Sequence, residues 1–288
     1  MGFLHRHRQL TPYLLLGPGL LWLGVFFVVP LGFLAYQSLQ SGNFDVGYAF
    51  SWAWGNYWNA LRDYRSQFIR SLEYAGVATA LALLISYPVA YWIAFRGGRW
   101  KNLLLLFIVA PFFVTYLIQT LAWESILSDN GLVVRTLQHL HILGSSGRLL
   151  ATSTAVVAGI TYNFLPFMAL PLYVALEQID QSLLEAAQDL YASKWRAFVR
   201  VTLPLSLPGV VAGTLLTFIP AAGDFINAQL LGSPNNHMIG NVIQSKFLEL
   251  TDYPAAASMS FILMAAILVA VLAYARAVGT EQLTGTAV

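Results

Sequence analysis

The sequence YPAAASMSFILMAAILVAVLAYA, residues 253–275, contains no charged residue and lies between Asp252 and Arg276. A helix needs roughly 20 apolar residues to cross the hydrocarbon core of a bilayer. Further uncharged windows of comparable length cover residues 10–39, 74–95, 102–123, 149–176 and 201–223. Together the six windows predict an all-α integral membrane protein with six transmembrane helices.

The composition excludes an ordinary soluble domain. Of the 288 residues, 58% are hydrophobic and 10% are charged, whereas a soluble domain carries about 25% charged residues. The net charge of +2 is too small to indicate nucleic acid as a partner, and the absence of cysteine excludes disulfides and thiolate metal sites. We expect one transmembrane domain over residues 1–288, with spans at about 12–37, 70–95, 102–124, 150–176, 205–230 and 254–276.

The distribution of Lys and Arg predicts the orientation. Six spans place both termini on one side, and that side holds nine of the 15 basic residues, in short segments near span ends. The positive-inside rule therefore predicts cytoplasmic termini. The nine residues are Arg6, Arg8, Arg96, Arg99, Lys101, Lys194, Arg196, Arg200 and Arg276.

Motifs for chemistry are missing from the sequence. It has no P-loop, no Gly-x-Ser-x-Gly elbow and no His-Glu-x-x-His pair, and no uncharged window contains a histidine. We therefore predict no catalytic and no metal-binding residues. Carriers driven by ion gradients usually show paired half-repeats and intramembrane charges, and neither is visible. Transport is the leading class, and a gated channel or a scaffold without ATP coupling is the rival.

The longest cytoplasmic loop, residues 177–204, is predicted to contain two short helices. Ser182 followed by Glu185 is a capping box, which favours a helix start at Ser182. Ser193 is a candidate cap for a second helix that leads into the fifth span. By composition alone, this loop is an amphipathic connector that lies on the membrane.

The order of residues in this loop resembles the signature of binding-protein-dependent ABC importer permeases. That signature is Glu-Ala-Ala, three residues, Gly, nine residues and then Ile-x-Leu-Pro. Here residues 185–187 are Glu-Ala-Ala and residues 201–204 are Val-Thr-Leu-Pro, so the spacing is kept. Tyr191 replaces the glycine. Glycine allows a positive φ, which costs tyrosine roughly 1 kcal/mol or more, so we expect a turn of different shape.

The resemblance covers nearly the whole chain and is closest to the spermidine/putrescine permease group. It rests on residues 13–18, 219–225, 230–232 and 237–241. Permeases for iron, thiosulfate and phosphonates are relatives, so these solutes stay open as alternatives. The resemblance implies the type I ABC importer permease fold and a multi-pass protein of the bacterial cytoplasmic membrane.

The resemblance also implies partners. These are a second permease, identical or homologous, a dimer of ATPase subunits and an extracytoplasmic substrate-binding protein. The chain would bind no cofactor, because ATP and Mg are used by the ATPase. Docking to the ATPase would fall to Glu185, Ala186, Ala187, Leu190, Tyr191, Leu203 and Pro204, with Leu203 and Pro204 fixing the turn into the fifth span.

Three carboxylates are candidates for the substrate path. Glu73, Glu124 and Asp224 fall near outer span ends, with Trp123 and Phe225 beside two of them. Carboxylates next to aromatic rings suit a polycation, through charge pairing and cation–π contact. For any single one, a position in the headgroup region is the simpler interpretation. We favour Asp224, either paired with an ammonium group of the substrate or holding a gate through a protein donor.

Overall fold

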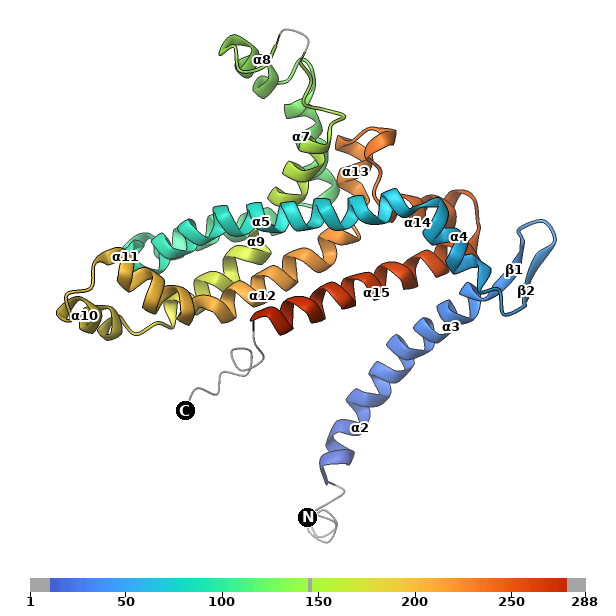
Figure 1. The fold of residues 1–288 in the computed structure, drawn as a ribbon, viewed down its shortest axis with the longest axis horizontal. Helices are drawn as coiled ribbons and strands as arrows, with labels where there is room; N and C mark the ends of the chain where they lie inside the picture. Colours follow the sequence, from blue (N-terminus) through green and yellow to red (C-terminus); the bar gives the residue numbers. More distant parts are fainter. Residues whose placement is uncertain (1–10, 145–146, 279–288) are drawn as a thin grey trace. The chain divides into compact units, whose positions relative to one another are not determined.

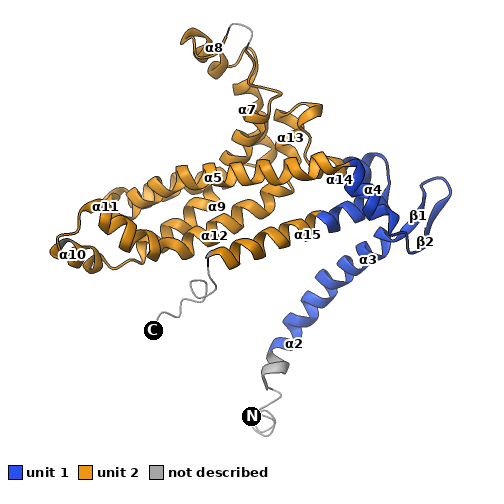
Figure 2. Ribbon diagram, viewed as in Figure 1, with its two compact units in different colours: residues 1–63, 243–262 blue, residues 64–242, 263–288 orange. Residues whose placement is uncertain are grey.

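The computed structural model describes residues 11–144 and 147–278, which are predominantly helical (Figure 1). Arg6 and Arg8, which support the predicted orientation, lie outside the described residues. The chain divides into two compact units, residues 1–63 with 243–262 and residues 64–242 with 263–288 (Figure 2), where the sequence analysis expected one domain. By length and composition, five described helices could cross a membrane, or six if one bent pair counts as a single span.

Unit 1 contains the N-terminal span and a hairpin. The span runs over Leu16–Ser38, and the amide of Asn56 donates to the carbonyl oxygens of Ser38 and Gln40 at its end, both at 2.9 Å. The backbone at this end is thereby satisfied. The elements are α2 (Thr11–Leu23), the π-helical η1 (Gly24–Val28), α3 (Val29–Ser38), the antiparallel strands β1 (Gln40–Asn43) and β2 (Gly47–Phe50), α4 (Gly55–Asp63) and π-helical η6 (Ser245–Glu249).

Unit 2 is built on three packed helices, α5 (Arg65–Arg96), α9 (Ser153–Glu177) and α12 (Leu203–Ala222). Two helices, α14 (Ile239–Gln244) and α15 (Tyr253–Val278), have residues in both units. The remaining elements are η2 (Gly98–Trp100), α6 (Lys101–Val109), η3 (Ala110–Phe113), α7 (Tyr116–Leu127), α8 (Leu132–His139), α10 (Gln181–Asp189), α11 (Lys194–Ala197), π-helical η4 (Phe198–Thr202), α13 (Ile226–Leu231) and η5 (Pro234–Asn236).

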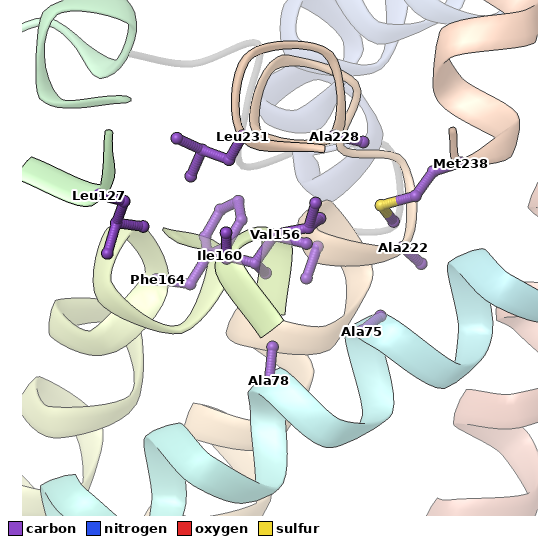
Figure 3. Close-up of a cluster of buried hydrophobic side chains, with 12 residues drawn as sticks. Ala75, Ala78, Leu127, Val156, Ile160, Phe164, Ala222, Ala228, Leu231 and Met238 are labelled. Carbon is purple, nitrogen blue, oxygen red and sulfur yellow. The ribbon is translucent and has the colours of Figure 1, made fainter. Parts of the chain in front are cut away.

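The buried face of α5 carries mainly small residues, whereas several of its large apolar side chains are exposed. In α5, Ala75 and Ala78 are fully buried, whereas Leu84 is 71% exposed. Figure 3 shows the two alanines facing a cluster that includes Val156 and Ile160 of α9. Small side chains let helix backbones approach closely, and this is the main means of helix association in lipid, where burial of leucine gains nothing. Large apolar side chains such as that of Leu84 are tolerated on the outside of a membrane helix, because lipid is as apolar as they are.

Gly209 sets the approach of α12 to α9. A Cβ added there would lie 2.5 Å from the Cβ of Ala175 and 2.7 Å from the carbonyl oxygen of Pro171. We expect Gly209→Ala to lower the free energy of unfolding by about 1–3 kcal/mol, because the helices must separate. Gly76→Ala is the matched control, since nothing lies within 4 Å of a Cβ added in α5. Thermal unfolding in detergent compares the two variants, and equal melting temperatures would contradict the close approach.

The third span differs from the single helix predicted over residues 102–124. The segments Gly98–Phe113 and Tyr116–His139 meet at a 96° bend. Pro111 has no N–H to continue the helix, and Val114 and Thr115 are extended. The amide of Gln119 donates to the carbonyl oxygens of Pro111 at 2.5 Å and Val114 at 2.9 Å. Such bonds satisfy backbone groups that a break in a membrane helix sets free.

The fifth span also differs from its prediction, residues 205–230. The helix α12 ends at Ala222, and α13 starts at Ile226. Pro220 lies in the last turn of α12 and removes one backbone donor. A carboxylate oxygen of Asp224 accepts the backbone N–H of Asn227 at 2.9 Å, which favours a new helix start. The break places Asp224 outside regular helix.

Candidate functional site

The cytoplasmic loop predicted from the signature forms α10 and α11, which Figure 1 shows together at one end of the α5–α9–α12 bundle. The start of α10 differs from the predicted capping box at Ser182. Asp180 caps this helix, because its carboxylate accepts the backbone N–H of Ser182 at 2.9 Å. The same N–H and the Ser182 hydroxyl hold the pKa of Asp180 below its usual value. The helix therefore starts at Gln181, one residue before the predicted start at Ser182.

The end of α10 has the turn that glycine normally permits. Tyr191 has a φ of 58°, in the left-handed region. The N–H of Ala192 donates to the carbonyl oxygen of Ala187 at 3.0 Å, which is the six-residue bond of a Schellman motif. The expected change in turn shape is therefore wrong. The chain keeps the glycine geometry and accepts the cost, about 1 kcal/mol, of a left-handed tyrosine.

The second half of the loop continues into α12 without a turn. Ser193 caps α11 as predicted, since its hydroxyl accepts the N–H of Arg196 at 3.3 Å. The π-helical η4 follows, and the N–H of Leu203 donates to the carbonyl oxygen of Phe198. Leu203 and Pro204 lie in the first turn of α12. Contrary to expectation, they do not fix the turn into the fifth span, because that turn lies at residues 190–193.

The loop presents apolar side chains to its surroundings. Leu190 is 82% exposed, Tyr191 is 96% exposed, and Trp195 is 71% exposed. Of the predicted docking residues, Glu185 and Ala186 are exposed and Ala187 is half-buried. Exposed apolar clusters on an otherwise polar loop are typical of contact surfaces. Sequence analysis missed Trp195, although its place four residues after Tyr191 was a signal.

Asp224 lies in a buried cluster of polar groups at the other end of α12. The Tyr116 hydroxyl donates to its carboxylate, and the Asn227 side-chain amide donates to the same oxygen at 2.9 Å. Asp224 is 7% exposed. All these donors are neutral, and among the described residues no salt bridge reaches Asp224. The carboxylate is therefore hydrogen-bonded by neutral groups, without a basic partner within the described ranges.

The polar cluster continues into the bundle through α9. The amide of Asn163 donates to the side-chain oxygen of Asn227 at 3.2 Å and to the Thr120 hydroxyl at 3.3 Å. The side-chain oxygen of Asn163 is buried and has no partner within the described ranges. These contacts tie α7, α9 and α13 together around one carboxylate, and a buried polar network of this kind fixes the relative positions of its helices.

A cavity of about 210 Å³ opens beside the carboxylate. Three of its lining residues are aromatic, and Asp224 is the one charged residue in the lining. The lining comprises Tyr116, Phe164, Pro220, Gly223, Asp224, Phe225 and Ile226. A carboxylate within an aromatic wall is a suitable environment for an organic cation, because ring faces attract positive charge.

The remaining predicted path residues do not line this cavity. Glu73 is exposed and Glu124 is half-buried. Trp123 packs edge-on against Tyr162, with ring centroids 5.3 Å apart. Asp224 and Phe225 are thus the two predicted residues that the structure brings together. Sequence analysis missed their partners on α7 and α9, whose only signal is the presence of amide and hydroxyl groups inside uncharged windows.

The comparisons with known proteins define the class. The chain belongs to the family of binding-protein-dependent transport system inner membrane components, whose profile matches residues 86–278. It is an inner-membrane protein of the ABC importer permease class. A solved bacterial alginate ABC transporter, in complex with its pentasaccharide-bound periplasmic protein, contains a chain of the same fold, with a TM-score of 0.69, 20% identity and coverage of 94% of this chain and 95% of that one.

Two relatives are similar over most of their length. The spermidine/putrescine transport system permease protein PotB of Haemophilus influenzae is 37% identical, over 89% of this chain and 90% of the relative. PotB of Escherichia coli is 38% identical, over 73% of this chain and 76% of the relative. The predicted family and the predicted permease fold are confirmed.

Proposed function

We propose that this chain is a permease subunit of an ATP-driven importer of polyamines, such as spermidine and putrescine. It would form the path with a second permease. A dimer of ATPase subunits would bind ATP and Mg, and an extracytoplasmic binding protein would deliver the cargo. This chain would catalyse no reaction itself. The observation that carries the proposal is the buried carboxylate of Asp224, which lines an aromatic cavity and has no salt-bridge partner among the residues that the structure describes.

The chemistry of the cavity favours ammonium groups. A carboxylate attracts an ammonium group by its charge, and aromatic rings add to that attraction. The cavity volume of about 210 Å³ is below the roughly 300–1,000 Å³ of typical small-molecule sites. It would therefore hold one ammonium-bearing end of a polyamine at a time. The names of the two similar permeases support the same substrate class.

In this proposal, the cytoplasmic loop of residues 177–204 couples ATP binding to movement of the permease. ATP binding can shift the permease only through contacts that differ between the two states of the transporter. In the proposed mechanism, α10 docks on the ATPase, and its movement is passed to α12 through α11 and η4. Continuity supports this route, since Lys194–Ala222 forms one helical segment from the loop into the bundle.

Competition for uptake in intact cells tests the substrate class. A strain that lacks its own polyamine importers would express this chain with the neighbouring transport genes. We expect uptake of radiolabelled putrescine and spermidine, inhibited by unlabelled polyamine and unaffected by thiosulfate, phosphonate or ferric iron. Uptake of one of these solutes in place of polyamine would refute the proposed cargo.

The proposed orientation places the termini and the loop in the cytoplasm. The chain contains no cysteine, so single cysteines can be introduced cleanly. A cysteine at Ser193 should resist an impermeant thiol reagent in intact cells, and a cysteine at Ser233 should react, because the two lie at opposite ends of α12. The reverse labelling pattern would overturn the orientation together with the ATPase contact.

A further inference from the structure

Tyr191 combines an unfavourable backbone with an unused side chain. Its φ of 58° lies in the region that glycine, asparagine and aspartate enter most easily. Its ring is 96% exposed. Within the described chain its side chain makes no hydrogen bond and no ring contact. The backbone conformation belongs to the turn that ends α10, and the exposed ring is the part of Tyr191 that this turn does not use.

Two further large apolar side chains close to Tyr191 in the sequence are also exposed. Leu190 precedes it and is 82% exposed, and Trp195 is 71% exposed on the following helix. The ring of Trp195 stacks on that of Phe198, with centroids 5.5 Å apart. We call Leu190, Tyr191 and Trp195 the apolar tip. Trp195 is thus held in place by Phe198, on the helical segment that continues into the bundle. The apolar tip therefore contains one fixed ring for a protein partner to contact.

We propose that Tyr191 is a partner-specificity residue, whose ring fills an apolar recess of the importer's own ATPase subunit. This inference rests on the proposed docking of α10. Continuity with that helix favours the ATPase as the occupant. An anionic lipid surface is the competing cover, which the exposed Lys194 and Arg196 beside Trp195 would suit, and the test below separates it from the ATPase.

Glycine at this position would separate the two properties of Tyr191. It would relieve the backbone and remove the ring, so the turn would keep its shape while the contact is lost. Asparagine also tolerates the left-handed region and has no ring. Phenylalanine keeps the ring and the backbone cost. These three substitutions therefore distinguish a ring contact from a requirement of the turn.

The test uses the assembled importer, isolated through a tag on this chain and held in lipid nanodiscs. The probe is the ATPase subunit that co-isolates with the wild-type chain, titrated onto the immobilised permeases. We expect Tyr191→Phe to bind it like the wild type. Tyr191→Gly and Tyr191→Asn should bind about tenfold more weakly or worse, as for loss of an aromatic anchor at an interface.

Wild-type affinity for both the glycine and the asparagine variant would overturn the inference, including the case in which lipid covers the ring. Equal weakening by phenylalanine would overturn the apolar recess. Ala187→Arg, measured in parallel, separates this failure from a failure of the proposed function. If Ala187→Arg blocks binding and the Tyr191 variants do not, only the role of Tyr191 is wrong. If Ala187→Arg also binds normally, the docking of α10 is wrong.

Discussion

Replacement of Ala187 by arginine should abolish ATP-driven uptake while the permease remains folded in the membrane. Ala187 lies half-buried on α10, and its carbonyl oxygen holds the turn at the end of that helix. A long charged side chain on a docking face both blocks close approach and places an unpaired charge in the contact. We expect uptake to fall by about tenfold or more. Uptake of labelled spermidine, normalised to permease abundance, measures the effect.

Asp189→Arg is the matched control. It introduces the same side chain on the same helix, about 200° around the helix from Ala187 by helical geometry. It also lies in the last turn, where a positive charge is favourable. Uptake should stay close to that of the wild type. If the two variants behave alike, the effect is on helix stability or abundance, and the docking face is assigned wrongly.

Asp224→Asn should reduce polyamine uptake by about tenfold or more, because it keeps the size of the side chain and removes the charge that pairs with an ammonium group. The complex should still assemble, since the amide oxygen can accept from the Tyr116 hydroxyl and the Asn227 side-chain amide, while the bond from the backbone N–H of Asn227 is lost. Asp129→Asn is the control, since Asp129 is exposed and paired only with Arg148 at 3.0 Å. Spermidine uptake and basal ATP hydrolysis are measured for each variant.

The two readouts separate the two roles of Asp224. A direct contact with cargo lowers polyamine uptake and leaves basal hydrolysis unchanged. A gate held through Tyr116 and Asn227 changes basal hydrolysis whatever the cargo. If Asp224→Asn transports polyamine normally with normal basal hydrolysis, both roles fail, and the carboxylate is an ordinary group at the end of a span.

The sequence predicted the helical class and the position of the loop because both depend on strong local signals. Long uncharged windows require a helical solution in lipid. The Glu-Ala-Ala spacing placed a helix where α10 lies, and Ser193 capped the next one as expected. The exact start of α10 was missed because Asp180 and Ser182 are both good caps. Only the folded backbone shows which side chain meets a free N–H.

The bends in the third and fifth spans could not be predicted from the same signals. Pro111 and Pro220 are apolar and fit an uncharged window, and many membrane helices tolerate proline without a break. The break after Pro111 depends on Gln119, whose amide satisfies the two carbonyl oxygens there. Gln119 lies in the same uncharged window, but the composition of that window does not distinguish an amide that satisfies a break from one on a continuous helix.

Of the residues in the buried polar cluster, Asp224 was the one predicted from the sequence. Asp224 was conspicuous because a carboxylate far along an uncharged helix is costly in lipid. Tyr116 and Asn163 come from other spans, and their contacts with Asp224 and Asn227, respectively, depend on how α7, α9 and α13 pack. At Tyr191, knowledge of the glycine in the signature led to the wrong expectation, because the turn geometry proved stronger than the preference of the side chain.

Transport by the reconstituted complex is the measurement that tests this interpretation of the chain as a whole. The tagged chain and its co-isolating subunits would be placed in proteoliposomes with the binding protein on one side and Mg-ATP on the side of α10. We expect labelled spermidine to accumulate only when ATP is present, and unlabelled putrescine to compete. Equal spermidine flux with and without ATP would identify a channel, and accumulation of thiosulfate in place of spermidine would identify a different cargo. Either result would contradict the proposed polyamine importer.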